Sequence, residues 1–219
     1  MKKIMRGVLL FGMLGGMILA CGNKSDNSSK DSTNSLATKN EKVYRIGVSQ
    51  IVDHPALNAA KQGFKDALSK NGIKADYDDK IANNEMSNQT LIMQQFSSDK
   101  KDLVYAITTP TAQAAKNQVD KSIPVVFASV TDPKSAGLVG ISNVTGTSGA
   151  APVEENLKLM KELLPKAKNI GIIYNSSEQN SVSEVNNLKK LAPKYGFNVV
   201  DKSVTNGTEL VSAANLVVK

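Results

Sequence analysis

The sequence has only one cysteine, one histidine and no tryptophan among its 219 residues. A single cysteine, Cys21, excludes a disulfide framework within the chain and leaves no set of thiols for a structural zinc site. A single histidine, His54, excludes most His-rich metal sites and makes any histidine-based triad depend on one residue. We therefore expect no metal ion.

Aromatic residues are also scarce, at 5% of the chain, and the positive charge is spread out. Lys2, Lys3 and Arg6 account for three of the 27 basic residues, so 27 − 3 = 24 basic and 20 acidic residues follow, a net charge of +4. The basic stripe with interleaved aromatic residues that nucleic-acid binders use is missing. No nucleic-acid partner is expected. The proportions of hydrophobic residues (41%) and charged residues (21%) are those of a globular protein.

The first twenty residues have the organisation of a secretory signal peptide, which we assign to residues 1–20. Met1–Arg6 is basic, and Gly7–Ala20 is an uncharged, mostly apolar run. A helix of that length would span about 21 Å, too short for a bilayer core of about 30 Å. A basic end, a short apolar run and a small residue before a cut are the marks of such a signal.

The run ends in Ile18-Leu19-Ala20-Cys21, which resembles a bacterial lipobox. The resemblance implies cleavage before Cys21 and acylation of that cysteine, for example with palmitate, giving a membrane anchor of more than one acyl chain. An ordinary signal peptide with a chance cysteine is the alternative. Residues 21–42 are polar and hold almost no apolar side chains, so we expect a flexible tether there.

Strands and helices alternate in residues 43–148. Strands are predicted at Val43–Gln50, Lys74–Ala82, Leu103–Thr108, Ile123–Ser129 and Leu138–Ser142. Helices are predicted at Pro55–Lys70, capped by Asp53 or His54, at Ser87–Ser98, capped by Ser87, and from Pro110, capped by Thr109. This order predicts an α/β lobe with a parallel sheet, right-handed crossovers and helices on both faces.

The pattern restarts after a stretch of small residues, 144–151, that has the composition of a hinge. We predict a second α/β lobe at residues 149–219, built from the following elements: helix Pro152–Leu164, strand Asn169–Tyr174, helix Val182–Ala192, strand Phe197–Ser203 and helix Leu210–Val217. Two strands are too few for a stable doubly wound sheet. We therefore expect an incomplete second lobe in a chain truncated at its C-terminus; a small complete lobe is the alternative.

Polar side chains follow the predicted strands at their carboxyl ends, where open parallel sheets bind ligands. These ends are Ser49-Gln50 with His54, Thr108–Thr111, Val130–Pro133 and Asn175–Glu178. Singly, such residues are more often caps and turns. Four polar strand ends in one chain nevertheless favour a ligand-binding cleft.

Signals for an enzyme are poor. No Gly-Lys-Ser/Thr phosphate loop follows a strand, no Gly-x-Ser-x-Gly elbow occurs, and His54 has no cysteine partner. We expect neither catalysis nor a cofactor. A secreted α/β hydrolase would need a nucleophile–base pair, and a two-lobe sugar-binding repressor would carry a DNA-binding headpiece in place of the lipobox.

Between about Val43 and Lys219, several segments resemble those of one protein family and occur in the same order. The segments are Ile46–Leu57, Ala67-Leu68 with Asn71-Gly72, Thr108–Ala114, Pro124–Phe127 running to Thr131–Pro133, Ala136–Val139, Asn143–Gly146 and Gly171–Asn175. The family is that of ABC transporter substrate-binding lipoproteins, of the tryptophan- and tyrosine-binding type. The resemblance implies a periplasmic-binding-protein type I fold of two Rossmann-like lobes, and a chain longer by roughly a hundred residues.

The resemblance also implies which residues face a solute. Those of the first lobe would be Ser49, Thr109, Thr111 and Gln113, with Asp132 at the rim. The polar strand end after residue 48 adds Gln50 and His54 as ligand-binding candidates. Those of the second lobe would be Asn175, Glu178 and Ser181. We expect a solute carboxylate near Thr109 and Thr111, and Asp132 or Glu178 opposite its ammonium group, because a buried ammonium needs a paired charge.

The implied partners are a small solute, an ABC permease and, through it, an ATPase, at the extracytoplasmic face of the cell membrane. An aromatic amino acid is the first expectation for the solute. A sensory lipoprotein that delivers its closed form to a receptor is the alternative.

Overall fold

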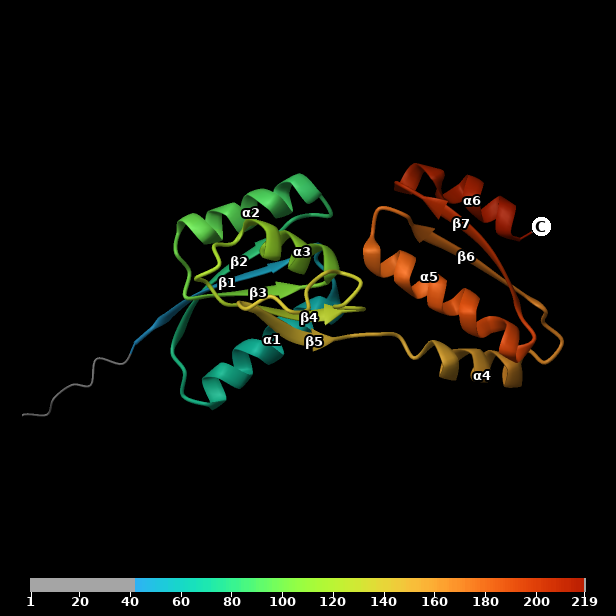
Figure 1. Cartoon of the computed structure of the whole chain (residues 1–219), viewed down its shortest axis with the longest axis horizontal. Helices are drawn as coiled ribbons and strands as arrows, with labels where there is room; N and C mark the ends of the chain where they lie inside the picture. The colour runs from blue at the N-terminus through green and yellow to red at the C-terminus, as the bar shows by residue number, and fades with distance from the viewer. Residues whose placement is uncertain (1–41, 219) are drawn as a thin grey trace, which may run out of the picture. The chain divides into compact units, whose positions relative to one another are not determined.

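The computed structural model describes residues 42–218 (Figure 1). The signal peptide predicted at residues 1–20, the acylation predicted at Cys21 and the part of the predicted tether up to residue 41 lie outside these residues. Within residues 42–218, no helix is long and apolar enough to cross a membrane.

Five parallel strands form the larger sheet, in the order β2-β1-β3-β4-β5. The strands are β1 (Tyr44–Gln50), β2 (Ala75–Ile81), β3 (Leu103–Ile107), β4 (Val125–Val130) and β5 (Val144–Ser148). The central strands are the most apolar, and β3 and β4 are buried along most of their length. This confirms the parallel sheet that the strand–helix alternation predicts.

Helices cover both faces of the larger sheet (Figure 1). Helix α1 (Pro55–Lys70) packs on one face, where Phe64 stacks on Tyr105 with 4.0 Å between ring centroids. Helices α2 (Met86–Ser98) and α3 (Thr109–Gln118) pack on the other face and bury Met93 and Phe96. Because apolar clusters pack on both faces of the sheet, the carboxyl ends of its strands are held in fixed positions relative to one another.

The three helices of the larger sheet start within one residue of the predicted positions, whereas α5 (Gln179–Leu191) starts three residues before the predicted Val182. His54 is the N-cap of α1, and its Nδ1 accepts from the Ala56 N–H at 3.2 Å, so the predicted cap is confirmed. The other two predicted caps are wrong by one or two residues. Helix α2 is capped by Glu85 rather than Ser87, and α3 by Thr108 rather than Thr109, and in neither case does the cap side chain accept from a backbone N–H of the helix.

The strand predicted at Leu138–Ser142 is wrong. That segment is a series of turns, with Gly137 and Gly140 at positive φ (69° and 81°), a conformation that glycine adopts without strain. The fifth strand lies instead in the stretch interpreted as a hinge. A Cβ at Gly146 would lie 2.1 Å from the Phe127 carbonyl oxygen, so the small residue permits close strand pairing here rather than bending.

Two parallel strands, β6 (Asn169–Asn175) and β7 (Asn198–Val204), form the smaller sheet. Its helical elements are α4 (Val153–Leu163), α5 (Gln179–Leu191), η1 (Ala192–Tyr195), η2 (Gly207–Glu209) and α6 (Leu210–Val217). Leu157 of α4 and Ala192 and Phe197 form its small buried core. The predicted order of elements after residue 152 is confirmed.

The smaller sheet repeats the beginning of the larger one. The succession β1-α1-β2-α2 corresponds to β6-α5-β7-α6, and both pairs of strands are parallel neighbours. Gly47 in β1 faces the Phe96 ring of α2, which a Cβ would approach to 2.6 Å. Gly171 in β6 faces Val217 of α6 in the same way, at 3.1 Å. Each glycine lets a helix pack closely on its strand.

Candidate functional site

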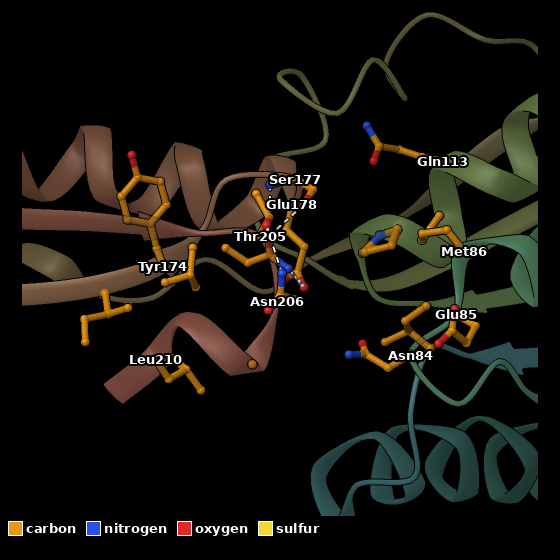
Figure 2. Close-up of a pocket in the computed structure, with 16 residues that line it drawn as sticks. Asn84, Glu85, Met86, Gln113, Tyr174, Ser177, Glu178, Thr205, Asn206 and Leu210 are labelled. Carbon is orange, nitrogen blue, oxygen red and sulfur yellow. Dashed lines mark hydrogen bonds between the residues drawn. The ribbon is translucent and has the colours of Figure 1, made fainter. Parts of the chain in front are cut away.

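A cleft of about 720 Å³ lies at the carboxyl ends of the strands (Figure 2). Its lining from the larger sheet comes from Ile51, Asn84, Glu85, Met86, Pro110 and Gln113. Its lining from the smaller sheet comes from Ile173, Tyr174, Asn175, Ser177, Glu178, Val204, Thr205, Asn206, Gly207 and Leu210. These residues lie in the last three positions of a strand or in the segments and helix beginnings that follow one, as expected for a ligand site in open parallel sheets.

Of the site residues predicted from the sequence, Gln113, Asn175 and Glu178 line this cleft. Ser181 lies against Glu178, and its Oγ donates to Oε2 at 3.3 Å. The others lie beneath the surface or beside the cleft.

Ser49 and Thr111 are fully buried and belong to a hydrogen-bond network around Gln89. Gln89 Nε2 donates to Ser49 Oγ at 3.0 Å, and Thr111 Oγ1 donates to Gln89 Oε1 at 3.1 Å. Thr108 Oγ1 and Thr111 Oγ1 are 3.2 Å apart. Thr109 is likewise buried, at 2% exposure. The side chains of Ser49, Thr108 and Thr111 fix the ends of β1 and β3, and their hydroxyl groups are already engaged within the protein.

The backbone is strained just after the carboxyl ends of β3 and β2. Thr108 has φ 87° and ψ 160°, a region that is otherwise almost confined to glycine. Asn83 and Asn84, after β2, have φ values of 55° and 63°. Strain of this kind costs on the order of 1–3 kcal/mol per residue and concentrates at functional sites, where packing over-determines the conformation.

Gln50 is buried at the end of β1, on the α1 side. Its Nε2 donates to Asn58 Oδ1 at 2.8 Å and to the Val52 carbonyl at 3.0 Å, while Asn58 Nδ2 donates to Asp53 Oδ1 at 2.7 Å. Its Oε1 has no hydrogen-bond partner within residues 42–218. His54 is exposed and serves as the α1 cap, so neither side chain lines the cleft.

Glu178 is the acidic side chain that the smaller sheet contributes to the cleft. Asn175 Nδ2 donates to its Oε1 at 3.1 Å, and Asn175 Oδ1 in turn accepts from the N–H and Oγ of Ser177 at 2.9 and 2.7 Å. The donors to Glu178, Asn175 and Ser181, are both neutral, so they orient the carboxylate without neutralising its charge.

Asp132 does not line the cleft. Its carboxylate accepts from the backbone N–H groups of Lys134 and Ser135 at 3.0 and 3.2 Å, from the Ser135 hydroxyl, and from Ser183 Oγ at 3.5 Å. These bonds, the Ser135 hydroxyl first, lower the pKa of Asp132. The side chain closes its own turn beside a separate hollow of about 310 Å³.

The sequence prediction missed Asn84, Glu85, Thr205 and Asn206, which also line the cleft. A polar residue just after a predicted strand would have identified them. Asn84-Glu85 follow the predicted strand Lys74–Ala82, and Thr205-Asn206 follow the predicted strand Phe197–Ser203. Gln89 gave no signal, since a buried amide on a helix is indistinguishable in sequence from an exposed one. In the part of the chain described, no three His, Cys, Asp or Glu side chains gather as a possible metal site.

Similar folds occur among solute-binding proteins. A leucine binding protein, LivK, from Thermotoga maritima matches with a TM-score of 0.63 at 15% identity, over 80% of this chain and 54% of that one. This likeness is one of fold: two Rossmann-like α/β units of the type I periplasmic binding protein. The fold class predicted from the sequence is thereby confirmed.

Closer relatives define the family. Residues 45–219 match the ABC transporter substrate binding protein family, and the chain belongs to it. A tyrosine-binding protein of Clostridioides difficile (strain R20291) is 42% identical over 99% of this chain and 65% of its own length. The ABC domain in complex with L-Trp from Streptococcus pneumonia is 34% identical with a TM-score of 0.74, over 78% of this chain and 61% of that one. The chain thus spans less than two thirds of these relatives.

Proposed function

We propose that this protein is the solute-binding component of an ABC importer and that it takes an aromatic amino acid. Family membership supports binding and delivery of a small solute. The tyrosine-binding relative and the relative in complex with L-Trp favour an aromatic amino acid. The observation that carries the proposal is the cleft at the strand ends, whose polar side chains lie beside the apolar surfaces of Ile51, Pro110 and Leu210.

Within this proposal, Glu178 pairs with the solute ammonium group. It lines the cleft with neutral neighbours, whereas Asp132 is engaged by its own turn and lies outside. The Thr111 hydroxyl is occupied by Gln89, so the solute carboxylate is assigned to N–H groups near the start of α3 and to the side chain of Gln113. An ammonium ion removed from water needs a paired charge, and Glu178 supplies it.

The proposal includes the anchor and the partners. Cys21 carries acyl chains at the extracytoplasmic face of the membrane, and residues 21–42 form the tether. Lobes 43–148 and 149–219 close on the solute, because the ligand shifts an open–closed equilibrium toward the form that contacts it from both sides. The closed form docks on the permease, and the protein itself catalyses no reaction.

Calorimetric titration of the full chain with L-Tyr, L-Trp and L-Leu tests the proposal. We expect saturable binding of at least one aromatic amino acid and weaker binding of L-Leu. A melting temperature shift accompanies it, since ligand at 100 times its dissociation constant stabilises a protein by about 2.7 kcal/mol. A folded chain that binds none of the three would contradict the proposal.

A further inference from the structure

The larger sheet contributes three apolar side chains to the cleft, those of Ile51, Met86 and Pro110. Ile51 follows β1, Met86 is the first residue of α2, and Pro110 lies in the first turn of α3. Ile51 and Pro110 are half-buried, whereas Met86 is 49% exposed. Figure 2 shows Met86 on the same side of the cleft as Gln113 and Glu85. This side of the cleft therefore offers apolar surface with polar side chains beside it.

The turn that precedes α2 anchors the backbone at Met86. The Ala82 N–H donates to the Gln50 carbonyl at 3.1 Å, and the Asn84 N–H donates to the Ile51 carbonyl at 2.7 Å. Both acceptors lie at the end of β1, a central strand of the larger sheet. The backbone that carries Met86 is thus tied to the sheet, and the freedom at this position belongs to the side chain.

The other apolar side chains of α2 either face the core or lie outside the cleft. Met93 and Phe96 are fully buried under the helix, whereas Leu91 is 61% exposed and does not line the cleft. Removing apolar surface from water is favourable, so an exposed apolar side chain at a ligand site gains from being covered by the ligand. Met86 is the exposed apolar side chain of α2 that a solute in the cleft can cover.

A methionine in this position suits an aromatic ring better than an aliphatic chain. The thioether sulfur is polarizable and makes favourable contacts at the edge of an aromatic ring, with the sulfur about 5 Å from the ring. The side chain is also unbranched, so it adapts to groups of different shape. A fixed backbone with an adaptable side chain accommodates both a phenol ring and an indole ring.

We propose that Met86 is a specificity-determining residue of the cleft and that its thioether packs against the aromatic ring of the bound solute. This inference rests on the function proposed above and adds the side chain that favours the ring. Ile51 and Pro110 supply the rest of the apolar surface from the larger sheet. The ammonium group stays with Glu178, so the ring and the charged end of the solute are recognised by different parts of the cleft.

Protection from oxidation tests this contact directly. The Leu91→Met variant of the full chain carries a second exposed thioether on the same helix but outside the cleft. Dilute hydrogen peroxide transfers one oxygen atom to an accessible thioether and leaves water, and mass spectrometry follows the sulfoxide at residues 86 and 91. We expect saturating L-Trp to slow oxidation at residue 86 at least about fivefold, and to change the rate at residue 91 by less than about twofold.

A pair of conservative substitutions tests the sulfur itself. Met86→Leu keeps an apolar side chain of similar volume but removes the thioether, so the affinities for L-Trp and L-Tyr should fall about two- to tenfold. Leu91→Met adds a thioether outside the cleft and should leave both affinities unchanged. Calorimetric titration measures the affinities, and thermal unfolding checks that both variants are folded.

The outcomes distinguish this inference from the function on which it rests. A wild-type chain that binds neither L-Trp nor L-Tyr contradicts the proposed function, and the role of Met86 falls with it. Binding of L-Trp without protection at residue 86, or with equal protection at residues 86 and 91, overturns the role of Met86 alone. Equal affinities of the wild type and Met86→Leu for both amino acids would also overturn it.

Discussion

The side-chain amide of Gln89 lies 3.0 Å from the hydroxyl oxygen of Ser49, 40 residues earlier in the sequence. The Oε1 of the same amide accepts from Thr111 at 3.1 Å. One buried side chain of α2 therefore connects the carboxyl end of β1 to the first turn of α3, which is the region that faces the cleft.

Replacing Gln89 by methionine should destabilise the protein by about 1–3 kcal/mol, because two buried hydroxyl groups lose their partner. Chemical denaturation measures the change. Gln94→Met is the matched control on the same helix: Gln94 is exposed, and the expected change is within about 0.5 kcal/mol. Similar losses for both variants would show that the network contributes nothing specific.

Glu178→Gln should weaken binding of an aromatic amino acid at least tenfold, because the solute ammonium group loses its charged partner while the carbonyl oxygen remains. Asp132→Asn should change the affinity little, since Asp132 is bonded to its own turn outside the cleft. Isothermal titration of both variants measures this. The reverse order of effects would move the ammonium site to Asp132.

Gly47→Ala should destabilise the protein by about 1–3 kcal/mol, because the new Cβ would lie 2.6 Å from the Phe96 ring and force it to move. Gly63→Ala is the control. Gly63 lies inside α1 with nothing within 4 Å of its Cβ position, so alanine there should stabilise by about 0.5–1 kcal/mol. Thermal unfolding of the two variants should shift in opposite directions.

Asp102 should make stability depend on pH in the acid range. Its carboxylate accepts from the Arg45 N–H at 2.8 Å and pairs with Lys42 at 2.9 Å, and these contacts, the backbone bond first, lower its pKa. A lowered pKa in the folded state gives stability that is present above the unfolded value of about 3.9 and is lost as pH falls through the folded value.

Asp102→Asn should therefore be less stable than the wild type at pH 7, by less than about 1 kcal/mol because the pair is partly exposed. The difference should shrink below about pH 4. Denaturation midpoints of both proteins between pH 7 and pH 2.5 measure it. A difference that does not vary with pH would mean that Asp102 acts through hydrogen bonding alone.

Much of the fold could be predicted because helices and buried parallel strands have separate periodicities. Val125–Ala128 is a continuous apolar run, and Leu57, Phe64 and Leu68 recur at helical spacing. The strand Val144–Ser148 could not be predicted in this way, since an edge strand of small hydroxyl residues resembles a loop. It was decided by the Phe127 backbone, against which only glycine fits at position 146.

The residues of the candidate site were likewise only partly predictable from the sequence. Gln113, Asn175 and Glu178 were predictable because the end of a parallel strand is visible in sequence and fixes a place at the edge of the sheet. Ser49, Thr111 and Asp132 occupy such ends too, yet their side chains are engaged by Gln89 or by their own turn. For Ser49 and Thr111, whether the side chain faces a ligand or a neighbour depends on Gln89, which is distant in sequence.

The sequence by itself determined the order of elements, the parallel character of the sheets and the polar strand ends, because these follow from local periodicity and chain connectivity. The tertiary structure alone decided which strand forms the last edge of the larger sheet and which polar groups hydrogen-bond to one another inside the protein. Those outcomes depend on side chains brought together across tens of residues, where hydrogen bonding and close packing select among arrangements that local sequence leaves equivalent.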